Sequence, residues 1–172
     1  PYFSYGNGAA MRVSPCGFAA SSLEEAVMLA RLVTQVTHNH PEALKAAEAV
    51  ASAIYLGRAG KSMKGIKEFI AEHYYRIDFT LDDIRPTYHF DVTCQGSVPQ
   101  AFAAFFESTG FEDAIRNAVS IGGDSDTIAA ITGGMAEAYY GVPEKVREKT
   151  LEYLDGEQKA TLRAFEDIFG SR

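Results

Sequence analysis

Apolar residues recur along most of this chain at intervals of three and four positions, which is the spacing of one face of an α-helix. The clearest stripe, at positions i, i+3, i+4, i+7 and i+8, is formed by Phe111, Ala114, Ile115, Ala118 and Val119. No segment alternates apolar and polar residues over a length that would build a sheet, and no internal repeat or low-complexity linker is present. The 172 residues are enough for one domain with a buried core, so the sequence predicts a single all-α, multi-helix domain over residues 1–172.

Turn and capping residues divide this pattern into separate helices. Ser21 or Ser22 is a candidate N-cap for the first long helix, and Pro41 suits the first turn of the next one. The stretch 74–95 contains Pro86 and lacks helical spacing, so we expect an irregular connection there. The expected helices are 22–37, 42–56, 65–73, 99–107, 111–119, one that starts with the Asp-Ser-Asp-Thr motif (124–127) and runs to about Tyr140, one that opens at Pro143, and 156–169.

Composition narrows the class of protein. The net charge is −7, with acidic and basic residues mixed along the chain, which argues against non-specific nucleic-acid binding. No apolar run approaches the length of a membrane span, and the first residues lack the basic segment of a signal peptide. Cys16 and Cys94 have no metal-type spacing, and we interpret them as free thiols in a reducing compartment, with one disulfide as the alternative. We therefore expect a cytoplasmic protein with no membrane or nucleic-acid partner.

The segment Gly122–Thr127, Gly-Gly-Asp-Ser-Asp-Thr, points most directly at chemistry. Asp124, Asp126 and Thr127 supply two carboxylates and a hydroxyl at the start of an expected helix, and Mg²⁺ or Ca²⁺ prefers such oxygen ligands. The alternative is helix capping, because Asp and Ser are strong N-cap residues. Two observations favour a metal site: one cap needs only one side chain, and the two glycines leave room for a ligand beside the backbone.

Two other metal motifs do not fit this segment. An EF-hand loop would need a further acidic or amide ligand at Ile128, then a glycine and a distant Glu. A phosphatase of the Asp-x-Asp type would follow a buried strand, whereas residues 118–121 belong to the helical stripe. The second acidic cluster, Thr80–Asp83, lacks a supporting glycine and is followed closely by Pro86. We interpret that cluster as a turn or cap with a solvated acidic face.

The amino-terminal segment Ser4–Arg12 is the second unusual motif. Its Gly-Asn-Gly, residues 6–8, allows left-handed backbone angles and can point several N–H groups in one direction. A helix that begins near Gly8 would add the positive end of its dipole, which favours phosphate. A lone Gly-Asn-Gly is a weak signal because most are simple turns, but here hydroxyl, phenol and amide side chains accompany it. His38, taken alone, is better explained as a residue at a helix C-terminus.

Taken together, four segments of the chain resemble the ADP-ribosylglycohydrolase family, which includes the dinitrogenase reductase-activating glycohydrolases. The matching segments, in family order, are Ser4–Pro15, Thr37–Pro41, Cys94–Ala101 and Phe111–Gly141. The resemblance implies an all-α fold and hydrolysis of the glycosidic bond that joins ADP-ribose to an acceptor. It also implies two bound Mg²⁺ ions, with Mn²⁺ as the alternative metal. The implied metal ligands are Asp124, Asp126 and Thr127, and the resemblance names no certain catalytic residue in this chain. The implied contacts to ADP-ribose are Ser4, Tyr5, Gly6, Asn7, His38, Gly123 and Ser125, with His38 on the pyrophosphate side.

One part of the family pattern does not occur in these 172 residues. Family members also have an earlier half, whose Thr-Asp-Asp cluster supplies further metal ligands and which holds an acidic residue that takes part in catalysis. Each ion prefers about six oxygen ligands, so three ligands cannot close a two-metal site. We therefore expect a carboxy-terminal half-domain, inactive alone, whose partner is the missing amino-terminal half or a second copy. Such a half would expose apolar helix faces, for example in Gly8–Ala20 or Ile128–Tyr139.

Two other functions stay open on the sequence alone. One is a non-catalytic module that binds ADP-ribose or another nucleotide through the amino-terminal motif and His38. The other is a helical interaction domain in which the acidic motif is only a cap. The acceptor from which ADP-ribose would be removed is not specified by any of these motifs.

Overall fold

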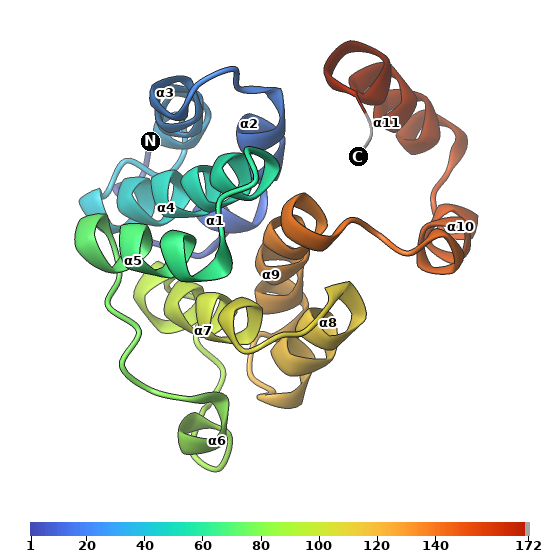
Figure 1. The fold of residues 1–172 in the computed structure, drawn as a ribbon. Coiled ribbons are helices and arrows are strands. Elements are labelled where there is room, and N and C mark those ends of the chain that lie inside the picture. Colours follow the sequence, from blue (N-terminus) through green and yellow to red (C-terminus); the bar gives the residue numbers. More distant parts are fainter. Residues whose placement is uncertain (171–172) are drawn as a thin grey trace.

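The computed structural model of the protein describes residues 1–170, which form helices joined mostly by short connections (Figure 1). The helices are α1 (Gly8–Met11), α2 (Ser14–Ala19), α3 (Leu23–Gln35), α4 (Pro41–Arg58), α5 (Met63–His73), α6 (Leu81–Ile84), α7 (Cys94–Phe106), α8 (Phe111–Ser120), α9 (Ser125–Tyr140), α10 (Glu144–Glu152) and α11 (Gly156–Phe169). Within this range, the β-type pairing is limited to an isolated antiparallel bridge between Gly6 and Thr93. The all-α prediction is therefore confirmed.

The core is organised around α4 and α9, which pack against each other. α9 also contacts α1, α2, α7 and α8, and its side chains Ile128, Ile131 and Met135 are completely buried. α4 is rich in alanine, and its small side chains let α1, α2 and α3 pack closely against it. The amino-terminal motif and the acidic motif are therefore attached to the same rigid core.

Local sequence signals set most of the helix ends. Ser22 caps α3 by accepting a hydrogen bond from the Glu25 N–H, and Gly141, with a φ of 77°, ends α9. The predicted helices 42–56, 65–73, 111–119 and 156–169 are confirmed by α4, α5, α8 and α11, with ends that differ by at most a few residues.

The predicted start of α7 at Pro99 is wrong, because the helix already begins at Cys94. Thr93 caps it by accepting a hydrogen bond from the Gly96 N–H. Thr93 was not recognised as a cap because Pro99 suggested a later helix start. Pro99 therefore lies inside the helix, where it removes a backbone donor. The helix continues because Val98 and Phe102, on either side, are fully buried, and this tertiary packing outweighs the local cost.

The stretch 74–95 is irregular as predicted, apart from the short α6 and the last two residues, Cys94 and Gln95, which already belong to α7. Thr80 caps α6, and the Asp83 carboxylate accepts a hydrogen bond from the Thr80 N–H in return, which forms a capping box. The interpretation of this second acidic cluster as a cap is therefore confirmed. Farther along, the stretch runs beside the amino-terminal loop, where the Asn7 N–H donates to the Val92 carbonyl at 2.7 Å.

α3 buries mainly small residues and exposes several large apolar ones. Ala26, Ala30 and Thr34 are buried on the side where α4 packs. The exposed large side chains on the other side are Met28, Leu32 and Val33, followed by Val36 just past the helix end. This face is apolar and solvent-exposed, which is uncommon for an outward helix surface.

The predicted exposure of apolar faces is wrong for Ile128–Tyr139 and holds for part of Gly8–Ala20, where Pro15 is exposed. In Ile128–Tyr139 the large aliphatic side chains are buried, because α4 and α7 cover them. In Gly8–Ala20 the side chain of Met11 is exposed, whereas Val13 and Cys16 are buried.

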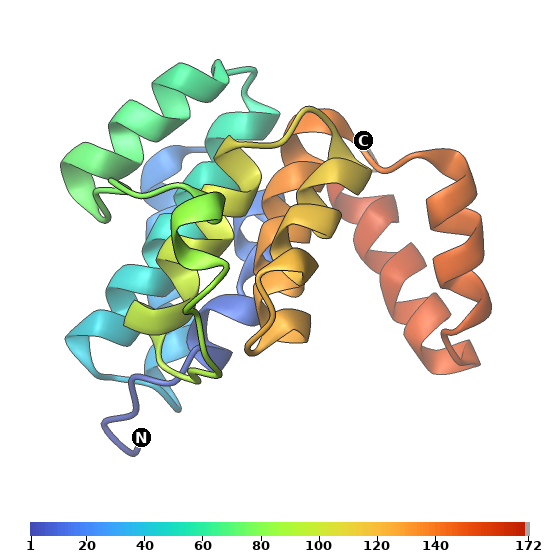
Figure 2. The same cartoon turned by 90° about the horizontal axis from the view of Figure 1, so that it is seen from below.

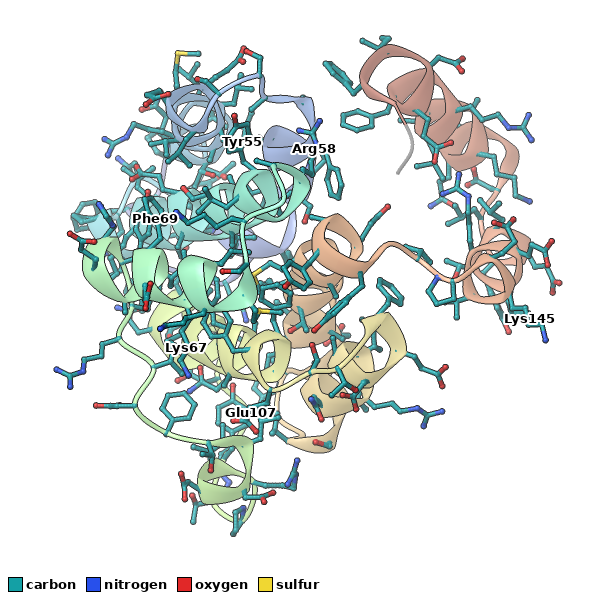
Figure 3. All side chains as sticks on the ribbon, in the orientation of Figure 1. Tyr55, Arg58, Lys67, Phe69, Glu107 and Lys145 are labelled. Atoms are coloured by element: carbon teal, nitrogen blue, oxygen red, sulfur yellow. The ribbon has the colours of Figure 1, made fainter. Side chains whose placement is uncertain are left out.

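α10 and α11 form an arm that projects from the other helices in both views (Figures 1 and 2). On the core side, Arg58 at the end of α4 donates to the carbonyls of Gly17 and Ala20 and so fixes α2 (Figure 3). A cavity of about 720 Å³ lies between the arm and the core, and its apolar lining includes Pro15, Phe18, Leu162 and Phe165. The arm therefore leaves a groove beside α2 and α9 rather than closing onto them.

The two cysteines and the lengths of the helices agree with what composition predicts. Cys16 and Cys94 are both buried and not disulfide-bonded, as interpreted from their spacing. Burial raises the pKa of both thiols, to about 12 for Cys94, so neither is a reactive thiolate. Within residues 1–170, no helix is both long enough and apolar enough to cross a bilayer.

Candidate functional site

Asp124 occupies the N-cap position of α9 but does not cap the helix. Its side chain accepts no hydrogen bond from the first turn of α9. The carboxylate oxygen Oδ2 instead accepts a hydrogen bond of 2.6 Å from Nδ2 of Asn7, and only 9% of Asp124 is exposed. The Ser, Thr and Asp residues that cap α3, α5, α6, α7 and α11 all accept a first-turn N–H, so Asp124 departs from this chain's own pattern. The capping alternative for this residue is therefore contradicted.

A chain of hydrogen bonds fixes the orientation of the Asp124 carboxylate. Asn7 is 6% exposed, and its Nδ2 also donates to the Ser97 hydroxyl at 2.9 Å. The Ser97 hydroxyl in turn donates to the Asp91 carbonyl at 2.8 Å. Asn7 therefore joins three distant segments, and its amide nitrogen is engaged inside the protein. Sequence reasoning named Asn7 as an ADP-ribose contact and missed Ser97, whose role depends on contacts far along the chain.

The backbone before Asp124 is held in an uncommon conformation. Gly122 and Gly123 have φ values of 73° and 66°, a region that side chains with a Cβ rarely adopt. A Cβ on Gly123 would also lie 2.4 Å from Cε1 of Tyr88, so this position has no space for one. Tyr88 is itself fixed by a hydrogen bond of 2.7 Å from its hydroxyl to the Gly96 carbonyl. The glycine pair thus lets the loop pass close to Tyr88, another contact that the sequence did not indicate.

The other residues of the acidic motif surround the start of α9. Asp126 is exposed and Ser125 is partly exposed. Thr127 is 8% exposed, and its hydroxyl lies 3.8 Å from the sulfur of Met11. The motif therefore presents one buried carboxylate, one exposed carboxylate and one hydroxyl near the same helix end.

The donor chemistry of these residues fits Mg²⁺, but their number does not complete a site. Carboxylate and hydroxyl oxygens are the ligands that Mg²⁺ prefers, and a complete shell contains about six. Nowhere in residues 1–170 do three His, Cys, Asp or Glu side chains gather closely enough to hold a metal ion. Asp124, Asp126 and Thr127 therefore fit one side of a metal site.

The amino-terminal motif and His38 come together beside the acidic motif. Nε2 of His38 lies 3.6 Å and 3.5 Å from the points where a Cβ would stand on Gly6 and Gly8. The Ser4 hydroxyl accepts a hydrogen bond of 3.2 Å from the Gly6 N–H, which curls the loop. Tyr5 is 47% exposed and its ring meets that of His40 edge-on at 5.2 Å between centroids. Ser4, Gly6 and His38 thus lie close together around the two glycines, and we call this group the cradle.

The expectation of a helix dipole at this cradle needs correction. The helix that begins at Gly8 contains four residues, Gly8–Met11, which is too short for a substantial macrodipole. The positive charge comes instead from Arg12, whose Nε donates to the Gly8 carbonyl at 2.6 Å. Burial, and next the charge of Arg12, lower the pKa of His38, so the imidazole is neutral at physiological pH.

The model of the ADP-ribosylglycohydrolase family matches residues 1–171. The chain belongs to this family. ADP-ribosylhydrolase ARH3 of Homo sapiens is 26% identical over 207 residues, which cover 94% of this chain and 57% of that protein. A protein of Archaeoglobus fulgidus is 31% identical over 173 residues, which cover 89% of this chain and 56% of that protein.

Two further matches agree with this assignment. The ADP-ribosyl-dinitrogen reductase glycohydrolase of Rhodospirillum rubrum is 29% identical over 148 residues, which cover 81% of this chain and 47% of that protein. A solved structure of an ADP-ribosylglycohydrolase-related protein complex superposes with a TM-score of 0.73 and 26% identity, and the match covers 98% of this chain and 61% of that chain. The chain therefore has the fold of the family and spans about half the length of the curated relatives that it matches.

Proposed function

We propose that this chain forms one side of the active site of a divalent-metal-dependent ADP-ribosylglycohydrolase. The observation that carries the proposal is the state of Asp124, a buried carboxylate that does not cap its helix and is oriented by Asn7. A side chain that served only as a helix cap would accept a first-turn N–H, and Asp124 accepts none. Relatives named as hydrolases of ADP-ribosyl groups support the reaction class.

The residues divide into two groups with different tasks. The cradle formed by Ser4, Gly6 and His38 binds the phosphate side of ADP-ribose, and Tyr5 offers an exposed ring beside it. Gly123 and Ser125, next to the acidic motif, contact the ribose. Asp124, Asp126 and Thr127 hold Mg²⁺, with Mn²⁺ as the alternative, because their oxygens are hard donors. The chemistry that such an ion supplies when bound is stabilisation of the charge that develops as the glycosidic bond breaks.

The remaining metal ligands come from a complementary part of the family fold, which we propose as the partner of this chain. Two carboxylates and one hydroxyl leave an ion short of the about six oxygens that it prefers. The groove between α2, α9 and the arm is an apolar surface on which a further helix can pack. A second copy of the chain is the alternative source of the missing ligands.

The test is release of ADP-ribose from an ADP-ribosylated protein, by this chain alone and by this chain co-expressed with the unmatched part of the Archaeoglobus fulgidus relative. We expect turnover only in the second preparation, and loss of turnover in Asp124→Asn. Asp82→Asn is a matched control, because Asp82 lies in the capping cluster of α6 and its side chain is 90% exposed. Full turnover by the isolated chain would contradict the half-site, and equal loss in both variants would contradict the role of Asp124.

Binding of ADP-ribose without hydrolysis is the second candidate. It is favoured by one observation, namely that the described part of the chain brings no three metal-binding side chains together. This reading predicts that ADP-ribose binds through the cradle with the same affinity with and without Mg²⁺. The metal-dependent reading predicts that Mg²⁺ strengthens ADP-ribose binding.

A further inference from the structure

Arg12 and His38 face each other across a single glycine. A Cβ on Gly8 would lie 3.1 Å from Nη2 of Arg12, and 3.5 Å and 3.7 Å from Nε2 and Cε1 of His38. Both side chains therefore border the small space that the missing Cβ leaves open. Arg12 comes from the end of α1 and His38 follows α3, so the fold brings the two together from separate helices.

A hydrogen bond to the backbone fixes the Arg12 side chain, and its Nη2 lies beside the space next to Gly8. Its Nε donates to the Gly8 carbonyl at 2.6 Å, so the guanidinium is fixed at one edge. An arginine side chain has five N–H donors, and this contact uses one of them. A guanidinium held by one edge can offer the other to a phosphate, in the bidentate geometry that arginine favours.

His38 is oriented from its other ring nitrogen. Its Nδ1 lies 2.7 Å from the Thr37 hydroxyl, whose oxygen is also 3.5 Å from the Thr34 carbonyl oxygen. The clamp proposed below requires the tautomer in which this hydroxyl donates to Nδ1 and Nε2 carries the proton on the side of the cradle. Burial of the ring lowers the pKa of His38 most, and the charge of Arg12 lowers it further. His40, the other imidazole of the segment, packs against the rings of Phe3 and Tyr5 instead.

We propose that Arg12 is a further diphosphate-binding residue of the cradle, which completes a clamp with His38 from two sides of Gly8. His38 on the pyrophosphate side is what the family resemblance already implies, so the new element is Arg12. This inference rests on the proposed function, which places the phosphates of ADP-ribose at this loop, and adds a residue that the family resemblance does not assign. Arg12 supplies the permanent positive charge, and His38 supplies a neutral N–H donor. An anion bound between them shields the imidazole from Arg12 and therefore favours its protonation.

The experiment measures binding of inorganic pyrophosphate, ADP-ribose and adenosine to the wild-type chain, Arg12→Gln and Arg12→Lys. Calorimetry gives the affinities, and NMR follows the amides of Gly6 and Gly8 and the ring protons of His38. Arg116→Gln is the matched control, because Arg116 is also exposed and also bonds through Nε to a residue four positions earlier.

We expect pyrophosphate and ADP-ribose to bind roughly 10- to 100-fold more weakly to Arg12→Gln, the loss typical of one charge-assisted hydrogen-bonded contact. Adenosine binding should not change, Arg12→Lys should recover part of the affinity, and Arg116→Gln should match wild type. The pKa of His38 should rise in Arg12→Gln, and it should also rise when pyrophosphate binds to the wild-type chain. A purely structural role of Arg12 would not produce these selective changes in affinity or the changes in the pKa of His38.

Two results would overturn the clamp. One is pyrophosphate that leaves the Gly6, Gly8 and His38 signals unshifted, and the other is equal affinity in wild type and Arg12→Gln. Hydrolysis lost in Asp124→Asn but unaffected in Arg12→Gln would refute the clamp while leaving the proposed function intact. An intact clamp with no hydrolysis in any preparation would refute the catalytic function instead.

Discussion

Replacement of Gly123 by alanine tests whether the loop before Asp124 is as constrained as its geometry indicates. The φ of 66° disfavours any residue with a Cβ by about 1–2 kcal/mol. The new Cβ would also lie 2.4 Å from Cε1 of Tyr88, so the ring must move and give up its hydrogen bond to Gly96, worth about 0.5–1.5 kcal/mol. We therefore expect Gly123→Ala to lower the free energy of unfolding by about 1.5–3.5 kcal/mol in urea denaturation.

The neighbouring glycine provides a matched control for this prediction. Gly122 has a similar φ of 73°, but no atom lies within 4 Å of the position of its Cβ. Gly122→Ala should therefore show only the conformational cost of about 1–2 kcal/mol. In a Tyr88→Ala background, the cost of Gly123→Ala should fall towards this value, with the His89 carbonyl oxygen still 3.2 Å from the new Cβ. Equal costs of the two glycine substitutions in the wild-type background would refute the role assigned to Tyr88.

Three further predictions follow from burial and hydrogen bonding. Asn7→Ala leaves the Asp124 carboxylate without its buried donor and should cost about 1–3 kcal/mol in urea denaturation, and an unchanged stability would contradict this. Burial raises the pKa of Glu137, so its ionised form destabilises the fold progressively as the pH rises above the ordinary pKa of 4.5. Glu137→Gln should accordingly stabilise the protein more at about pH 7 than at about pH 4, and a gain independent of pH would be inconsistent with that cause. Ala30→Leu should overpack the inner face of α3 and cost about 1–3 kcal/mol, whereas Leu32→Gln on its outer face should change stability by less than about 0.5 kcal/mol, as thermal melts can measure.

The parts of the fold that the sequence predicts are those governed by short-range chemistry. The helix ends at Ser22 and Gly141 and the capping box at Thr80 depend on residues within one turn of one another. Helical spacing likewise locates α8 and α9, because one face of each is buried. By contrast, α3 has apolar residues on two sides, and only packing against α4 decides that its alanines face inward.

The candidate site shows the same division. The residue types of the acidic motif indicate oxygen ligands, but whether Asp124 is a cap or a ligand depends on Asn7, 117 positions away. Ser97 lies 90 positions from Asn7, and no local pattern connects them. Tyr88 and Arg12 were missed for the same reason, since their contacts with Gly123 and Gly8 exist only in the folded chain. The family resemblance predicted from the sequence that these segments share one site, whereas residue spacing alone did not predict it.

The central claim, that the acidic motif and the cradle form one side of a metal-dependent ADP-ribose site, is tested most directly by titration calorimetry. ADP-ribose is titrated into the purified chain with and without Mg²⁺, and into Asp124→Asn/Asp126→Asn. We expect ADP-ribose to bind in each case and Mg²⁺ to strengthen its binding to wild type but not to the double variant. ADP-ribose binding that is identical with and without Mg²⁺ would contradict metal binding by these residues, and no ADP-ribose binding at all would contradict the site itself.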